Sequence, residues 1–467
     1  MDRRAFLSRT VRAALGGVAA TSMLGQMRLV EAATTASLPR GDAGYRALVC
    51  LFLYGGNDSV NTIVPIDGVA RSAYQGSRGT LQLPVSALLP LTPVAGGAAP
   101  SDGCRYGLQS AIRAGDAVGT SGLRDLFATG KAAVVCNVGT LVRPTTKPQY
   151  QTPGFSLPPQ LFSHDDQQTY WQTSRPDSSL GWGGRIADLL YATNSNTVLP
   201  MTMTIGGENV LQRGAVVNQY ALNPHPQGAV PISAIENSWN APRRDILREM
   251  NAPEAQAHRL ERAFARSMNR AIDNYGMVAT ALAGAPNVAT VFPDTRLGAQ
   301  LRMVARLVAA RQTLGMQRQI FFVSAGGFDT HDTQLADHPG LLSDVARSLA
   351  AFYAATVELG VAESVTTFTA SDFGRTLSSN GDGSDHGWGG HHFVIGDAVR
   401  GGSFYGAMPS LTVGGQDDAG WGQVIPTLSV DQYGATLARW FGVGSSLMSD
   451  IFPNIGNFPV ADIGFMR

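Results

Sequence analysis

The stretch from residue 320 to residue 375 decides the fold. Residues 320–331 read Ile-Phe-Phe-Val-Ser-Ala-Gly-Gly-Phe-Asp-Thr-His, and residues 365–375 read Val-Thr-Thr-Phe-Thr-Ala-Ser-Asp-Phe-Gly-Arg. Each begins with a short apolar run, which predicts a buried strand, and ends in small and polar residues, which predict a loop. Between them, residues 340–359 carry apolar side chains at helical spacing. The order strand, loop, helix, strand, loop predicts right-handed βαβ units and a parallel sheet.

Two more apolar runs extend this pattern toward the N-terminus. Residues 47–53 and 132–138 predict strands buried on both faces, and the first ends in Tyr54-Gly55-Gly56-Asn57-Asp58. Residues 198–232 predict short strands or an inserted hairpin. Further helices are expected over 252–283, 297–317 and 430–442, with Leu260, Phe264, Met268 and Ile272 facing the core. The fold class is α/β: a central, mostly parallel sheet flanked by helices on both faces, with loop or hairpin insertions.

The amino-acid composition argues against several classes of function. The chain has 467 residues, a formal net charge of zero and 15% charged residues. A zero balance without basic runs argues against a nucleic-acid partner, which would require a positive face. Its two lysines, Lys131 and Lys147, do not fit the spacing of a phosphate-binding loop. The three cysteines permit at most one disulfide, and Cys50 and Cys136 lie in apolar runs that predict buried structural thiols.

The N-terminus reads as an export signal. Residues 2–8 are Asp-Arg-Arg-Ala-Phe-Leu-Ser, and a mildly apolar stretch follows over 11–24. The paired arginines resemble a twin-arginine signal, with an ordinary secretory signal or an amphipathic helix as the alternative. We expect residues 1–33 to be this signal and residues 34–467 to form one domain. The twin-arginine machinery would deliver it to the periplasm or beyond, without a stable membrane span after cleavage.

Histidines and aspartates gather directly after the predicted strands. Ligands of open α/β sheets bind at the carboxyl ends of the strands, so these side chains can converge on one crevice. Imidazole and carboxylate together suit divalent transition metals, and neighbouring glycines let the backbone bend so that close ligands face one ion. The candidate metal ligands are Asp58, Asp329, His331, Asp372, Asp385, His386, His391 and His392.

Structural roles are the alternatives for these residues. Asp58 can cap a helix or hold a turn, and Asp329 and His331 can form an Asx-turn beside a surface histidine. Residues 385–392 can be a surface loop, and Arg375 can pair with an aspartate instead of binding an anion. The remaining histidines, His225, His258 and His338, are expected to face solvent.

Three longer motifs carry a resemblance to a known family. They are Leu-x-Gly-Gly-x-Asp-Ser-x-Asn at 53–61, Gly-Gly-Phe-Asp-Thr-His at 326–331, and Phe-Gly-Arg-Thr…Asn-Gly…Asp-His-Gly-Trp-Gly-Gly-His-His at 373–392. With Ser163-His164 and the terminal helix from residue 432 to 442, they resemble a bacterial family of exported proteins of unassigned function. That family, a domain of unknown function, is placed in the alkaline phosphatase/sulfatase-like superfamily. The resemblance covers nearly the whole chain after residue 33.

The resemblance implies a central sheet flanked by helices and a two-metal site. Asp58 matches the aspartate that binds one metal, and Asp329 with His331 matches the Asp/His pair of the other. His391 or His392 would be the late histidine of the superfamily.

Two further residues match the superfamily pattern, and two features of the sequence depart from it. Asp372 stands where the superfamily usually has Asp-His-Gly, and Ser163 matches the nucleophile at a helix start. Phe373 replaces the expected histidine, which residues 385–386 can compensate. The Asp/His pair is separated by one residue instead of the common three.

We therefore expect an exported, metal-dependent hydrolase of a phosphate or sulfate ester, acting on a small molecule or a glycan. One or two Zn, Mn, Ca or Mg ions would act with Ser163, His164 and Arg375 as catalytic residues, and Ser163 or a water would attack. Because Phe373 departs from the superfamily, the alternative is a catalytically degenerate protein of the same fold that binds an envelope glycan or a protein partner. A structural subunit of an envelope assembly is a third reading.

Overall fold

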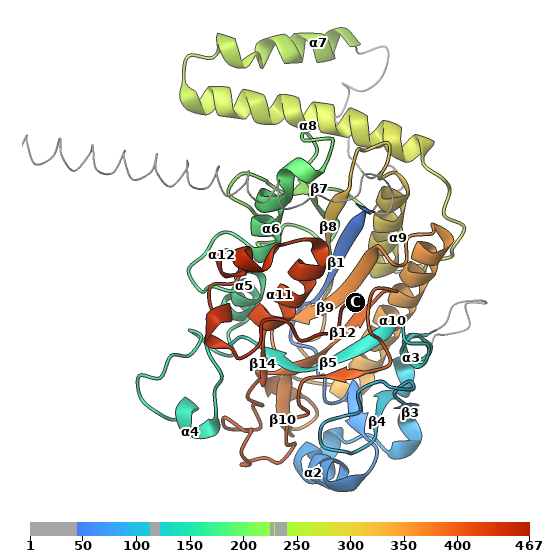
Figure 1. Cartoon of the computed structure of the whole chain (residues 1–467), viewed down its shortest axis with the longest axis vertical. Helices are drawn as coiled ribbons and strands as arrows, with labels where there is room; N and C mark the ends of the chain where they lie inside the picture. Colours follow the sequence, from blue (N-terminus) through green and yellow to red (C-terminus); the bar gives the residue numbers. More distant parts are fainter. Residues whose placement is uncertain (1–43, 113–121, 225–227, 229–240) are drawn as a thin grey trace, which may run out of the picture.

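β1 (Arg46–Leu53) lies in the interior of the sheet that the sequence predicts (Figure 1). It pairs in parallel with β8 (Arg318–Ala325) on one side and with β9 (Val365–Ser371) on the other. The computed structural model describes residues 44–112, 122–224, 228 and 241–467. The expected export signal, residues 1–33, and His225 lie outside these ranges, so the export signal and the solvent-facing position of His225 stay predictions.

The full sheet is mixed but mostly parallel. Its strands run in the order β13-β5-β12-β9-β1-β8-β6-β7, with β14 paired to β5. β12 is antiparallel to both β5 and β9, and it occupies a stretch that the sequence predicts to be part of a polar loop. The other strands of this sheet are β5 (Ala132–Gly139), β6 (Thr202–Thr204), β7 (Tyr220–Ala221), β12 (Gly390–Ile395), β13 (Phe404–Tyr405) and β14 (Leu428–Ser429).

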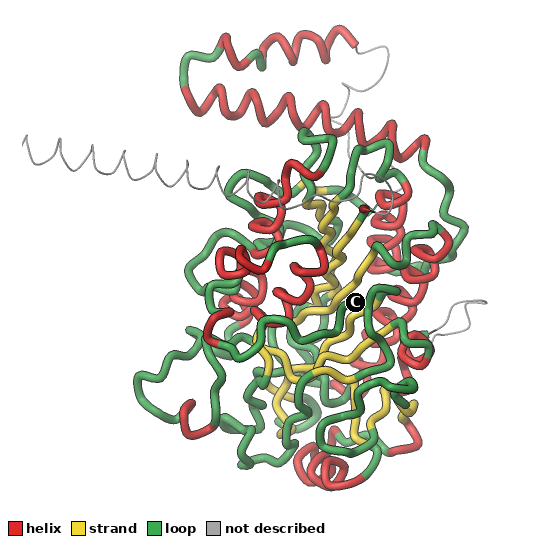
Figure 2. Tube along the Cα trace, in the orientation of Figure 1, coloured by secondary structure: helices red, strands yellow, loops and turns green. Residues whose placement is uncertain are grey.

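Helices cover both faces of this sheet, which confirms the predicted α/β class (Figure 2). Alternate residues of β1 face opposite sides: Val49 and Leu51 pack into one apolar core, and Leu48 and Cys50 into a second. The first core includes residues of α3 (Leu123–Ala128), α9 (Arg296–Ala309) and α10 (Gln334–Glu358), together with the C-terminal part of a further helix, α8 (Arg259–Gly284). Those of the second are α5 (His164–Thr173), α6 (Trp182–Leu190), α11 (Val430–Phe441) and α12 (Met448–Ile451).

Smaller elements extend from this core. A three-stranded antiparallel sheet has the order β2-β4-β3, and a two-stranded hairpin joins β10 to β11. Their bounds are β2 (Ile63–Pro65), β3 (Leu88–Leu91), β4 (Tyr106–Gln109), β10 (Arg375–Ser379) and β11 (Ser384–His386). The remaining helices are α2 (Gly68–Arg78), α4 (Lys147–Tyr150) and α7 (Ala241–Met250).

The longest predicted helix differs from the structure. The chain turns over residues 251–258, and α8 begins at Arg259 because His258 caps its N-terminus in a capping box. Ile272 is buried as predicted, but Leu260 and Phe264 are exposed, so the prediction that they face the core is wrong. Their half of the helix extends away from the sheet (Figure 1).

The cysteine prediction is confirmed. Cys50 and Cys136 are buried and free, as is Cys104. Within the described ranges, no helix combines the length and apolar character that crossing a bilayer requires.

Candidate metal centre

Three loops and one helix start bring the candidate ligands together. Asp329 follows β8, Asp372 follows β9, His386 ends β11, and His164 is the first residue of α5. Because β8, β1 and β9 are parallel neighbours, their carboxyl ends meet at one edge of the sheet, as the sequence predicts.

The Gly55-Gly56 turn after β1 allows this close approach. Both glycines have positive φ angles, of 112° and 85°, which favour glycine. A Cβ on Gly55 would lie 2.3 Å from the backbone nitrogen of Asp329, and a Cβ on Gly56 would lie 2.5 Å from the ring of Phe373. The missing side chains therefore let the loops after β1, β8 and β9 pack against one another.

The imidazoles of His164, His331 and His386 lie close together, and the hydrogen-bond partner of each ring indicates which of its nitrogens carries a proton. The Nδ1 of His386 is 2.7 Å from the backbone carbonyl oxygen of Phe162, which can only accept, so His386 carries a proton on Nδ1. The Nδ1 of His331 is 3.0 Å from Oδ1 of Asp385, a carboxylate that also accepts from Asn380. Both rings therefore direct an Nε2 lone pair toward the interior of the cluster.

His164 has the same arrangement. Its Nδ1 donates to Oδ2 of Asp372 at 2.6 Å, and that oxygen also accepts from the side chain of Gln168 and the backbone nitrogen of Gly55. The hydrogen bond to Asp372 raises the pKa of His164, and burial opposes the shift. Oδ1 of Asp372 is buried without a hydrogen-bond partner among the described residues.

The three Nε2 atoms surround the carboxylate of Asp329. They lie 3.3 Å (His164), 3.0 Å (His331) and 3.3 Å (His386) from its oxygens, and the Nε2 atoms of His331 and His386 are 2.9 Å apart. Lone pairs and carboxylate oxygens repel at these distances unless a proton or a metal ion lies between them.

A single bound metal cation would stabilise the three Nε2 lone pairs and the Asp329 carboxylate better than protons on several of the rings would. Ring centroids of His164 and His331 lie 4.3 Å and 4.8 Å from that of His386, so neighbouring imidazolium ions would repel. Burial lowers the pKa of His386, which also disfavours a second proton there. Ligand atoms of His164, Asp329 and His386 all lie within 4.8 Å of one another. His331 lies outside this group but contacts both Asp329 and His386. Two imidazoles and one carboxylate, with His331 as an adjacent fourth donor, fit a divalent transition ion.

Arg375 completes the charge balance of this cluster. Its Nη1 donates to Oδ1 of Asp329 at 2.6 Å and contacts the carbonyl of Gly55, while Nη2 and Nε contact Ser384. Burial raises the pKa of Asp329, but Arg375 and the nearby imidazoles outweigh this and hold the pKa below its ordinary value. Since all three nitrogens have protein partners, Arg375 adopts the structural pairing that the sequence left open.

Phe373 has a positioning role in this cluster. Its ring stacks on His386 with centroids 4.7 Å apart and lies 4.9 Å from His164. The residue that departs from the superfamily pattern thus packs against two candidate ligands.

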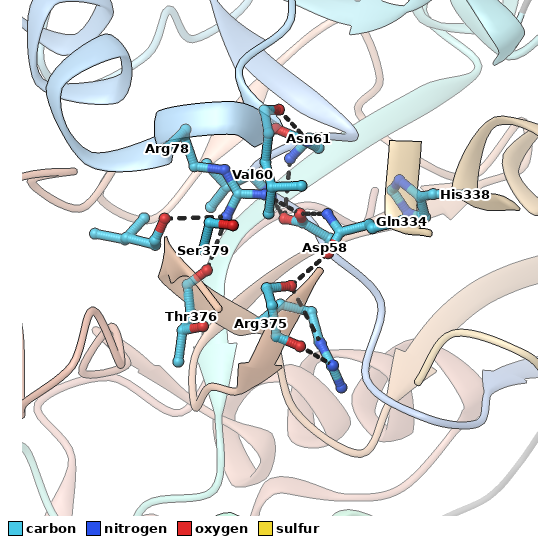
Figure 3. A network of polar contacts seen from close by, with 12 residues as sticks. Asp58, Val60, Asn61, Arg78, Gln334, His338, Arg375, Thr376 and Ser379 are labelled. Carbon is cyan, nitrogen blue, oxygen red and sulfur yellow. Dashed lines mark hydrogen bonds and ion pairs between the residues drawn. The ribbon is translucent and has the colours of Figure 1, made fainter. Parts of the chain in front are cut away.

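Asp58 lies in a buried network of polar contacts that also includes Arg78, Gln334 and Arg375 (Figure 3). One oxygen contacts Arg78 and Gln334, and the other accepts from the backbone nitrogens of Val60 and Asn61 at 3.2 and 3.1 Å. Burial favours the neutral acid, but Arg78, His338 and the hydrogen bonds from Asn61 and Gln334 together outweigh it and keep the pKa of Asp58 below its ordinary value. Its metal-ligand role stays a prediction, while the observed contacts are those of a turn paired to a buried arginine.

Gln334 links Asp58 to the residues around Arg375. Its side chain donates to Asp58 and accepts from Ser384, the residue that also holds Arg375. One helical turn later, His338 is 1% exposed and its Nε2 is 2.9 Å from Oδ1 of Asn57. The expectation of a solvent-facing His338 is therefore wrong, and burial lowers its pKa to about 4. The sequence held no signal for these contacts, because α10 begins before the expected residue 340.

His391 and His392 lie side by side on β12, so their side chains point to opposite faces. The Nδ1 of His391 accepts from the backbone nitrogen of Asn137, and His392 packs between Trp171 and Tyr433. The metal-ligand role of His391 or His392 stays a prediction, while the observed contacts are those of buried strand residues. Burial lowers the pKa of His391 to about 4 and that of His392 to about 3.

Ser163 lies beside the cluster at the start of α5. Its Oγ donates to Oδ2 of Asp166 at 2.6 Å, a partner that the sequence analysis missed. The preceding residue, Phe162, has a φ of 72°, which is strained for a bulky side chain. This backbone directs the carbonyl of Phe162 to His386 and so links Ser163 to the cluster.

Fold and site together define an α/β protein with a candidate transition-metal centre at the carboxyl edge of its sheet. The chain belongs to the family described as "Protein of unknown function (DUF1501)", which matches residues 45–419. No curated protein matches the chain.

Two solved structures are similar to this chain. The crystal structure of Ps i-CgsB in complex with k-i-k-neocarrahexaose is 10% identical, with 88% of this chain and 76% of that chain covered and a TM-score of 0.35. The PsFucS1 sulfatase from Pseudoalteromonas sp. is 11% identical, with 90% and 72% covered and a TM-score of 0.28.

Proposed function

We propose that this chain is a metal-dependent hydrolase of a phosphate or sulfate ester, with one divalent ion held by His164, Asp329, His331 and His386. One observation carries the proposal: three Nε2 atoms and a carboxylate converge within 3.3 Å contacts. The hydrogen bonds on the opposite ring nitrogens direct the lone pairs inward. His164 is thereby proposed as a ligand instead of a catalytic residue.

The donor set also favours particular ions. Imidazole nitrogens suit Zn and other transition ions, whereas Ca and Mg prefer oxygen ligands. We therefore favour Zn or Mn over Ca or Mg. Asp385 and Asp372 hold ligand rings through Nδ1, the role that outer carboxylates play at metal–histidine sites.

A divalent ion held here would polarise an ester oxygen and stabilise the negative charge that develops on it. Ser163 is the candidate nucleophile, since Asp166 accepts its hydrogen bond and can take its proton. Ser163 would attack phosphorus or sulfur, and the ester oxygen would leave as an alcohol after gaining the proton that Asp166 took from Ser163. Water would then hydrolyse the ester formed on Ser163, which releases phosphate or sulfate and restores the hydroxyl. We also propose, from the resemblance of the sequence motifs, that the chain belongs to the alkaline phosphatase/sulfatase-like superfamily.

Metal content is the first test. Protein purified without chelator is expected to hold about one equivalent of Zn or Mn by elemental analysis, and His331→Ala and His386→Ala should lose it. The matched control is His258→Asn, an exposed histidine at the start of α8 that lies outside the cluster. Wild-type protein that stays metal-free after incubation with either ion would refute the metal centre.

Activity is the second test. Aryl phosphate and aryl sulfate esters should be hydrolysed by the metal-loaded protein, and Ser163→Ala should lower kcat without lowering metal content. If the loaded protein cleaves neither ester, the hydrolase is refuted even though the metal centre stands.

The second candidate is a non-catalytic protein of the same fold that binds an envelope glycan or a protein partner. The observation that favours it is that Arg375 donates to Asp329, Gly55 and Ser384, which leaves at most one of its N–H groups for a substrate anion. Under this alternative, the loaded protein would bind glycans or a partner without turnover, and Ser163→Ala would change nothing.

Export completes the proposal. Residues 2–8 carry the paired arginines, and we place the protein in the periplasm or outside the cell. Changing Arg3 and Arg4 to lysine should retain the protein in the cytoplasm of a host with a working twin-arginine pathway. Unchanged export of that variant would point to an ordinary secretory signal.

A further inference from the structure

α7 and α8 form a helical hairpin at one end of the molecule's long axis, clear of the sheet and its covering helices (Figure 1). The C-terminal half of α8 attaches this hairpin to the body, since Val278, Ala281 and Leu282 belong to an apolar core. The first half of α8 projects beyond that attachment (Figure 1).

The projecting half carries an apolar stripe. Leu260 is 73% exposed and Phe264 is 62% exposed, and their four-residue spacing places both on one side of the helix. On α7, Ile246 and Met250 are 55% and 69% exposed at the same spacing. These four residues therefore expose aliphatic and aromatic side chains at the end of the molecule that the hairpin forms.

An arginine stripe runs along a different side of the same helix. Arg259, Arg262, Arg266 and Arg270 recur every three to four residues, which places the centre of their stripe more than a right angle around α8 from Leu260 and Phe264. Of these, Arg262 also donates to the backbone carbonyls of Gln256 and Ala257. Over residues 259–270 these four arginines face one acidic residue, Glu261, so the segment carries a net charge of +3 in a chain whose total is zero. Glu261 itself is held at the helix start by its hydrogen bond to the backbone nitrogen of His258.

We propose that the α7–α8 hairpin docks on an anionic membrane surface. Leu260 and Phe264 would enter the headgroup boundary while the arginines contact lipid phosphates, which is the arrangement of interfacial amphipathic helices. Because the hairpin forms the end of the long axis, a flat surface can reach it without contacting the body (Figure 1). A second copy of this chain is a poorer occupant, since its own arginine stripe would face the first. The proposal is independent of the proposed hydrolase.

Vesicle co-sedimentation tests this proposal. The full chain is mixed with vesicles of phosphatidylcholine alone or with 30% phosphatidylglycerol, so that any binding through residues 1–33 is common to all variants. We expect binding to the anionic vesicles that weakens as salt rises. Arg266→Glu with Arg270→Glu should weaken it about 30-fold or more, from the loss of two phosphate contacts. Leu260→Gln with Phe264→Gln should weaken it about tenfold or more.

Two matched controls separate the hairpin from general surface effects. Val216→Gln with Val291→Gln changes exposed apolar residues elsewhere, and Arg296→Glu with Arg400→Glu changes exposed arginines elsewhere. Both controls should bind like the wild type. The proposal is overturned if the hairpin variants bind as tightly as these controls. It is equally overturned if gel filtration shows a dimer that Leu260→Gln with Phe264→Gln dissociates, because a second copy would then cover the stripe.

Discussion

Replacing Arg78 by methionine tests the structural reading of Asp58. Both side chains are fully buried and form an ion pair, and Arg78 also donates to the carbonyl of Thr376 at 2.7 Å. Removing one partner of a buried pair costs about 3–5 kcal/mol, since the remaining charge is left uncompensated. Asp58 would keep its bonds from two backbone nitrogens and from Gln334, so we expect the lower end, about 3 kcal/mol.

The loss should also depend on pH. Without Arg78, burial raises the pKa of Asp58 above the unfolded value, so the folded variant gains a proton at acid pH. The deficit in the free energy of unfolding is therefore smallest at low pH and grows as pH rises through the new folded pKa. Combining Arg78→Met with Asp58→Asn should cost less than the sum of the single changes.

Urea unfolding followed by tryptophan fluorescence and circular dichroism measures these values, with chelator present so that bound metal adds nothing. Arg105→Met is the matched control, because its ion pair with Asp67 is exposed and solvent-screened, so its loss should change the free energy of unfolding far less than Arg78→Met. The reasoning is refuted if Asp58→Asn unfolds like the wild type yet loses its metal. Asp58 would then be a ligand, as the sequence predicts.

Three further changes follow from the contacts of single residues. Asp385→Ala should weaken metal binding about 10- to 100-fold in a chelator competition, because Asp385 holds the ring of His331, and unchanged affinity would show that His331 needs no such support. Phe373→Leu should also weaken metal binding about 10- to 100-fold, with little change in secondary structure, because the Phe373 ring stacks on His386. A variant that binds metal as tightly as the wild type would contradict the positioning role of Phe373. Burial raises the pKa of Asp431 to about 7, so the folded state keeps a proton that the unfolded chain releases near pH 4. The free energy of unfolding should fall by up to about 4 kcal/mol as pH rises from about 4 to 7, and Asp431→Asn should remove this slope in urea midpoints; an equal slope in both proteins would reject it.

The local pattern of the sequence determined the α/β class, because burial on both faces requires continuous apolar runs. Residues 47–53, 132–138, 320–323 and 365–369 all lie in strands of the main sheet. The sequence also determined that polar residues collect at one edge, since parallel strands end on the same side. Asp329, Asp372 and His386 meet there, as predicted.

Tertiary structure alone decided which of these residues share a centre. His164 comes from a distant helix start, and its role depends on the hydrogen bond to Asp372, which no local pattern encodes. β12 pairs with two strands far away in sequence, which separates His391 from His392 although they are adjacent in the chain. Long-range pairing likewise assigned Asp58 to Arg78, because a buried carboxylate takes whichever cation the fold places beside it.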